Sequence, residues 1–153
     1  RKSRRQYSPR PQGVSMPLAV DTNVLARALA DDGSDQVAIA QSIVGQSEVF
    51  VSRTVLLETE WVLRSVPKLP DGLINQLFSG LTGLENVELE TRPIVLSSIA
   101  AHAKGMDFAD ALHLYSATHC AEFATFDKPL ARKAPKVTGI PAIRLLRSPR
   151  KRK

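Results

Sequence analysis

The chain has 153 residues, which is enough for one domain of ordinary size. Its single cysteine, Cys120, excludes an intrachain disulfide and a cysteine-based zinc site, and we expect it to be a small buried side chain. No apolar run approaches the ~18 residues that a membrane-spanning helix needs, so we expect no membrane association and a cytoplasmic location.

The net charge of +6 is unevenly distributed. Residues 1–15 and 144–153 carry only basic charges, which leaves a net charge of −5 on residues 16–143. Basic ends indicate a polyanionic partner such as RNA, although two solvated ends give the same pattern. We interpret residues 1–15 as a disordered basic N-terminal extension, residues 16–146 as one domain and residues 147–153 as a basic C-terminal tail.

Along the domain, short apolar runs alternate with helical patterns, and capping residues, prolines and glycines mark their ends. The elements expected in chain order are a strand at 17–20, a helix at 23–30, a helix from 34 or 35 to about 46, a strand at 49–51, a helix at 54–66, a helix from 70 to about 84, a strand at 87–90, a helix from 93 to about 104, a helix capped by Asp107 that reaches 119, a strand at 122–125, a helical turn at 128–132 and a strand at 142–146.

This alternation favours a parallel sheet covered by helices on both faces. In such sheets, functional sites form beyond the carboxyl ends of the strands. Asp21 and Asp127 each follow an expected strand, while Glu58 and Asp110 lie in helices that can approach the same edge. One cleft can therefore collect all four carboxylates.

Carboxylates within apolar segments are unfavourable unless something compensates their charge, and a hard divalent cation is the usual compensation. We expect Asp21, Asp110 and Asp127 to bind Mg²⁺ or Mn²⁺, with Glu58 as a further catalytic acid. Such an ion activates water and stabilises a phosphate, so the hypothesis is a metal-dependent hydrolase.

Three polar residues are expected to support these ligands. Asn23 and Thr125 can hydrogen-bond to them, and Asp107 is either a helix cap or a ligand for an outer water. Glu60 is two residues from Glu58, so it points in another direction and is expected to be solvated. The histidines, His102 included, are expected to have ordinary structural or surface roles.

Four segments resemble PIN-domain ribonucleases, and most closely the VapC-type toxins of VapBC toxin–antitoxin pairs. The similarity covers about residues 16–146, and its motifs are Val20–Leu25, Val51–Leu63, Met106–Leu114 and Ala124–Asp127. The resemblance implies a three-layer α/β/α sandwich with a central, mostly parallel sheet. It implies Mg²⁺- or Mn²⁺-dependent endonucleolytic cleavage of RNA by Asp21, Glu58, Asp110 and Asp127. It also implies a homodimer that binds a small VapB-like antitoxin in a heterotetramer or larger assembly.

Two other readings remain open. A phosphatase of the haloacid-dehalogenase type also begins with a strand and an Asp, but it needs a second Asp where this chain has Asn23. The other alternative is a catalytically silent PIN-like module that binds RNA or acts as a scaffold. Cleavage of RNA that EDTA inhibits and Mn²⁺ restores separates the nuclease from the module.

Overall fold

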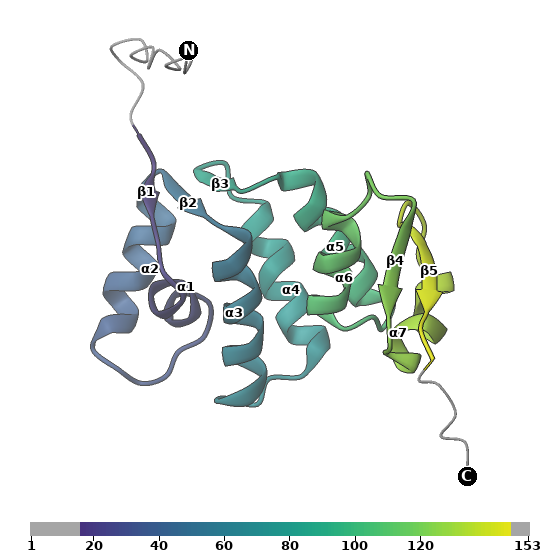
Figure 1. Ribbon diagram of the computed structural model, residues 1–153. Coiled ribbons are helices and arrows are strands. Elements are labelled where there is room, and N and C mark those ends of the chain that lie inside the picture. Colours follow the sequence, from purple (N-terminus) through teal and green to yellow (C-terminus); the bar gives the residue numbers. More distant parts are fainter. Residues whose placement is uncertain (1–15, 148–153) are drawn as a thin grey trace, which may run out of the picture.

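The computed structural model describes residues 16–147, so the expected extension at 1–15 and most of the expected tail at 147–153 lie outside the described residues. The fold is mixed α/β with parallel strands, as the sequence predicts (Figure 1). Its elements are β1 (Leu18–Ala19), α1 (Thr22–Leu29), α2 (Gln36–Gln46), β2 (Val49–Val51), α3 (Arg53–Ser65), α4 (Asp71–Thr82), β3 (Val87–Leu89), α5 (Arg92–Ala103), α6 (Phe108–Ser116), β4 (Glu122–Thr125), α7 (Lys128–Lys133), the 3₁₀ turn η1 (Ala134–Lys136) and β5 (Ala142–Leu145).

Capping side chains set where several helices begin. Asp21, Ser52, Asp107 and Asp127 each accept a hydrogen bond from a backbone N–H in the first turn of the helix that follows. At the end of α5, Gly105 has a φ of +87°, and its N–H donates to the carbonyl of His102 at 2.9 Å. Glycine suits this left-handed position because it has no Cβ, so it ends the helix without strain.

The first sheet contains three parallel strands in the order β1-β2-β3. The central strand β2 buries Val49 and Val51 almost completely. By contrast, both residues of β1 are exposed, and Leu18 retains 52% of its accessible surface. The prediction of a buried strand at 17–20 is therefore wrong: β1 is an edge strand, and Val20, just beyond it, is the residue that packs into the core.

The second sheet contains β4 and β5, which pair in parallel from Glu122 opposite Ala142 to Thr125 opposite Leu145. Figure 1 shows this sheet at the opposite end of the molecule from β1, with α5 and α6 between them. Across residues 16–147, the strands thus form two parallel sheets rather than one continuous central sheet.

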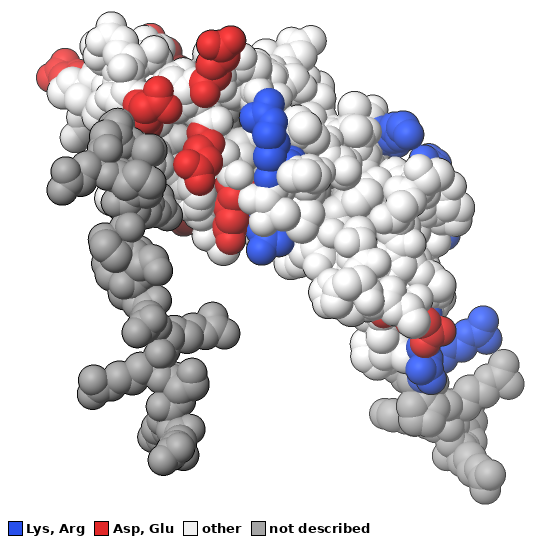
Figure 2. Space-filling model, turned by 90° about the horizontal axis from the view of Figure 1, so that it is seen from above, with Lys and Arg blue, Asp and Glu red and all other residues white. Residues whose placement is uncertain are grey.

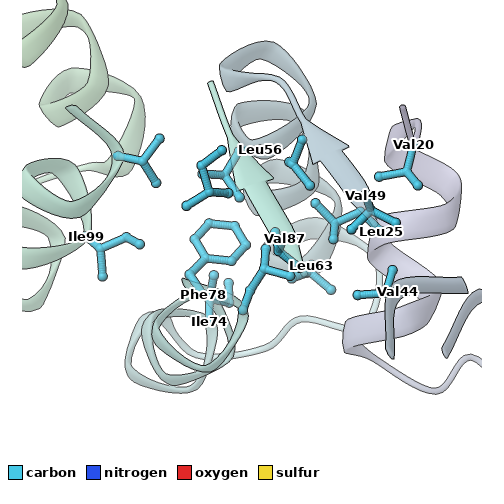
Figure 3. Packing of buried hydrophobic residues seen from close by; sticks show 14 of the residues in the cluster. Val20, Leu25, Val44, Val49, Leu56, Leu63, Ile74, Phe78, Val87 and Ile99 are labelled. Carbon is cyan, nitrogen blue, oxygen red and sulfur yellow. The ribbon is translucent and has the colours of Figure 1, made fainter. Parts of the chain in front are cut away.

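Each sheet has its own apolar core. The first core packs the inner faces of α1, α3 and α4 against β2, β3 and Val20, which follows β1 (Figure 3). At its centre the rings of Phe78 and Phe108 meet edge to face, with their centroids 5.2 Å apart. This geometry adds about 0.5–1.5 kcal/mol beyond burial alone.

The second core is smaller and richer in alanine; it contains Ala101, Met106, Ala111, Leu114, Leu130, Ala134 and Val137. Helices α5 and α6 contribute to both cores, because Ile99 and Phe108 pack into the first while Ala111 and Leu114 pack into the second. The helix pair therefore forms a layer between the two sheets.

Two further observations concern the surface. Cys120 lies exposed in the turn between α6 and β4, so the prediction that it is buried is wrong; its segment connects two elements at the surface instead of packing in either core. Among residues 16–147, none of the helices combines the length and hydrophobicity required of a membrane span.

Candidate functional site

The first group of acidic residues lies where α1 and α3 meet. Asp21 follows β1 and caps α1, and its Oδ1 accepts from the N–H of Val24 at 2.9 Å. Thr22 donates its hydroxyl to Oε2 of Glu58 at 2.7 Å. Both carboxylates are exposed. The structure thus brings Glu58 of α3 next to the Asp21-Thr22 segment, although the sequence separates them by more than one complete helix.

Asn23 belongs to the same group. It is exposed in the first turn of α1, and its side-chain oxygen lies 3.4 Å from Nη1 of Arg27. Arg27 in turn forms an ion pair with Asp32 at 3.2 Å. No hydrogen bond joins Asn23 to either carboxylate among the residues described, so its expected supporting role stays a prediction.

The second group lies where α6 and α7 begin. Asp107 caps α6, and its Oδ1 accepts from the N–H groups of Ala109 at 2.9 Å and Asp110 at 3.2 Å. Asp127 caps α7 by accepting from the N–H of Leu130 at 2.9 Å. The expectation that Asp107 is a helix cap is confirmed, and that of a ligand to an outer water is not tested.

Asp110 is half-buried between these two caps. Burial raises the pKa of Asp110, and the nearby carboxylates of Asp107 and Asp127 raise it further. His113 and Lys133 partly offset this effect on the pKa. Asp127 contributes to this shift in the pKa of Asp110, although β4 separates the two residues in sequence.

Thr125 supports this second group locally. Its hydroxyl oxygen accepts from the backbone N–H of Asp127 at 2.9 Å. The bond fixes the turn between β4 and α7, and hence the direction of the Asp127 side chain. Thr125 thus positions a candidate ligand through the backbone.

The donor set of the second group fits a hard divalent cation. It offers only carboxylate oxygens, which are the ligands that a hard divalent cation prefers. Mg²⁺ typically needs only one or two protein carboxylates, with water and phosphate as its other ligands. Asp110 and Asp127 are the candidate ligands, although among the described residues the three acids of this group do not bring their ligand atoms within 4.8 Å of one another.

The two groups remain separate in the structure. Asp21 follows β1 and Asp127 follows β4, and these strands belong to separate sheets at opposite ends of the molecule (Figure 1). Within residues 16–147, no hydrogen bond or ion pair connects one group to the other. The structure therefore brings the four predicted acids together as two sets, each at the carboxyl end of a different sheet.

The profile of the PIN domain family matches residues 18–136. The chain belongs to the PIN domain family. PIN domains are typically metal-dependent nucleases, which agrees with the all-oxygen donor sets described above. Comparisons with curated proteins and with solved structures give no match.

A third polar cluster of this PIN domain was missed by the sequence interpretation. Glu60, Asp71 and His102 come from α3, α4 and α5, and they each place a potential ligand atom within 4.8 Å of the others. Glu60 is only 3% exposed, so the prediction that it is solvated is wrong. The signal was available: Leu56, Glu60 and Leu63 recur at helical spacing on the buried face.

Protein groups already satisfy the charges of this third cluster. Glu60 pairs with Arg64 at 2.9 Å. The side-chain amide nitrogen of Asn75 donates to the carbonyl of Ile99 at 2.8 Å and lies 3.3 Å from Nδ1 of His102. Glu60 and His102 thus already have protein partners, and both contacts connect neighbouring turns or helices. We therefore assign this cluster a structural role in joining three helices.

Proposed function

We propose that this PIN domain is a Mg²⁺- or Mn²⁺-dependent endoribonuclease and the toxin of a VapBC-type toxin–antitoxin pair. The observation that carries the proposal is the family match over residues 18–136, together with the half-buried Asp110 beside the helix cap Asp107. The family supports nuclease chemistry, and the motifs around Asp21 and Asp110 support the toxin assignment.

Asp110 and Asp127 would hold the cation, and Asp21 would complete its ligands where the two acidic groups are brought together. A divalent cation bound there supplies a Lewis acid that lowers the pKa of water and stabilises negative charge on the phosphodiester. Asp107 keeps Asp110 at the start of α6, and Thr125 orients Asp127. Glu58, which accepts a hydrogen bond from Thr22, would accept a proton from the attacking water in the same assembled site.

The charge distribution requires basic side chains to bring RNA to an acidic site. On the face shown in Figure 2, acidic side chains gather towards the end of the molecule that holds the first sheet, and basic side chains lie beside them. Lys128 is exposed directly after Asp127, and Lys133 is close enough to lower the pKa of Asp110. We propose that both contact RNA phosphates.

Arg53 is another basic side chain near the start of α3, but it already has partners within the protein. It donates to the hydroxyl of Ser116 at 2.9 Å and lies 3.7 Å from Glu90. These contacts join the start of α3 to the end of α6, so Arg53 stabilises the fold as well as adding positive charge. Removal of Arg53 is therefore a poor test of RNA binding.

A hollow between α1 and α3 supports an antitoxin partner. It has a volume of about 480 Å³, and its lining includes Asn23, Arg27, Val62 and Val66. Trp61 on α3 and Val66 just after it are 56% and 73% exposed, so they add apolar surface near this hollow. We propose that the apolar part of the antitoxin covers this region and approaches Asn23 next to Asp21.

The separation of the two acidic groups favours one alternative, a catalytically silent module that binds RNA. Single-turnover cleavage of structured RNA with Mn²⁺, with EDTA and with Mn²⁺ restored discriminates between them. The nuclease proposal expects cleavage only when Mn²⁺ is present, and expects Asp110→Asn to abolish it. RNA binding without cleavage under any metal condition would support the module instead.

A further inference from the structure

The two sheets each end in a strand with an unpaired edge. Leu18 donates its N–H to Glu48 at 2.7 Å and Val20 donates to Phe50 at 3.2 Å, so the peptide groups of Ala19 between them face away from β2. In the second sheet, the carbonyl oxygens of residues 121 and 125 accept bonds from residues 142 and 146. The alternation of a strand therefore directs the peptide groups of Ala124 away from β5.

Among the described strands, these two edges are also the least protected against pairing. Edge strands usually carry charged side chains that discourage association. The other outer strands have one, Glu88 in β3 and Arg144 in β5. β1 has none, and Leu18 is 52% exposed on it; β4 has one only at its first residue, and Phe126 just beyond it is 68% exposed.

The second core keeps β4 away from β1 of its own chain. Leu130 and Val137 hold the β4–β5 sheet against Ala111 and Leu114 of α6, and the same helix packs its other face into the first core. For β4 to reach its own β1, the chain would have to separate these buried side chains. A second copy can present its β1 without that loss.

We propose that β4 of one copy pairs in parallel with β1 of a second copy, and that each functional site is built across the two chains. This inference rests on the proposed function, because it assigns that function's four acids to two subunits. Asp21 follows the last residue of β1 by two positions, and Asp127 follows the last residue of β4 by two positions. In-register pairing at the usual strand spacing of about 4.8 Å therefore places these carboxylates side by side.

The exchange is reciprocal. Each chain gives Asp21 and Glu58 to one site and Asp110 and Asp127 to the other. The arrangement has twofold symmetry, removes both free edges and stops at two chains. The partner of the β1 and β4 edges is thus a second copy of this chain.

Complementation between two inactive variants tests the proposal. Asp21→Ala and Asp127→Ala each damage every site of a homodimer, so each alone should lose activity at least about 100-fold. In a mixed dimer, one site carries both changes and the other site is intact. Co-expression at equal levels should then restore about a quarter of the wild-type activity, because half of the dimers are mixed and one of their two sites works.

Activity that stays at the level of the single variants, while the wild type cleaves RNA, would overturn the proposal and place all four acids in one chain. The matched control is Asp110→Asn mixed with Asp127→Ala. Both changes lie on the same side of the exchange, so every mixed site keeps a defect and this pair should not recover. Recovery of the control pair would equally contradict the proposed division of residues.

A crosslinking experiment gives a readout that does not need activity. In a Cys120→Ser background, Ala19→Cys and Ala124→Cys chains are mixed and oxidised. A covalent dimer that contains one chain of each kind is expected, and exposed Ala38→Cys on α2 in place of Ala19→Cys should not give it. A chain that carries both Ala19→Cys and Ala124→Cys is tested in parallel. A disulfide that forms only within this chain, and not between two chains, would overturn the exchange. If the two cysteine variants crosslink but the wild type does not cleave RNA, the exchange holds and the nuclease proposal is the part that fails.

Discussion

The half of the molecule built on β1–β3 and the half built on β4–β5 differ in how they are stabilised. The first has a core of large side chains, among them Leu25, Leu56 and Phe78, each at most 1% exposed. The second has a small core, and its strands are partly or fully exposed along their whole length. Since two strands alone are marginally stable, the second half depends on α5 and α6 for its position. Of the five acids in the two candidate groups, Asp107, Asp110 and Asp127 lie at the starts of α6 and α7, next to this smaller core.

The largest effect on stability is expected from Phe78→Ala in the first core. Phe78 is fully buried and packs on Phe108, so its removal should reduce the free energy of unfolding by about 3–5 kcal/mol.

Leu130→Ala in the second core should reduce the free energy of unfolding by about 2–3 kcal/mol and should increase hydrogen exchange mainly in β4 and β5. Equal exchange throughout the domain after Leu130→Ala would show that the two halves unfold as one unit.

The largest effect on activity is expected from Asp110→Asn. It keeps the shape of the side chain but removes the negative charge, so RNA cleavage with Mn²⁺ should fall at least about 100-fold. Asp35→Asn is the matched control, because Asp35 is exposed and its side chain makes no capping bond. A similar loss in both variants would remove Asp110 from the site.

The two glutamates of α3 should behave in opposite ways. Glu60→Gln removes the partner of Arg64 in a buried position and should lower stability by about 1–3 kcal/mol, with cleavage changed little. Glu58→Gln should reduce cleavage and leave the midpoint of thermal unfolding nearly unchanged, because Glu58 is exposed. Thermal unfolding and RNA cleavage are measured on both variants. Loss of cleavage in Glu60→Gln with loss of stability in Glu58→Gln would contradict these expectations.

Sequence reasoning finds the helices because their signals are local. The cap at Asp107, the apolar spacing and the prolines and glycines place α1, α6 and α7 within a few residues. The division into two sheets is not local, since it depends on whether β4 packs against Ala111 and Leu114 or beside β1. Because β4 packs against α6 and not beside β1, the edge of β1 is exposed and the two acidic groups are separate.

The site shows the same limit. Thr22 and Glu58 meet because α1 crosses α3, a contact that no spacing in the sequence encodes. Glu60 was misassigned for a different reason: its position on the helix indicates burial, but an acidic residue there is expected only once Arg64 is recognised as its partner. Because Glu60 is acidic, it was predicted to be solvated, although its position on the helix indicates burial.

The smallest expected effect concerns the metal-free protein. Burial and the carboxylates of Asp107 and Asp127 raise the pKa of Asp110, so its ionised form opposes folding at neutral pH. With EDTA, Asp110→Asn should therefore be more stable than the wild type at pH 7, by at most about 1 kcal/mol after screening by solvent. A folded-state pKa above the unfolded value means that stability falls as the pH rises through that interval. The advantage of the variant should disappear near pH 4, and a constant advantage would contradict this origin.

Anomalous diffraction from crystals soaked in Mn²⁺ tests the convergence of the acids most directly. We expect an ion about 2.1 Å from carboxylate oxygens of Asp110 and Asp127, with Asp21 of the same or a second copy next to it. An ion bound only between Glu60, Asp71 and His102, or Asp21 far from any ion that Asp110 binds, would show that these acids do not form one metal-dependent site.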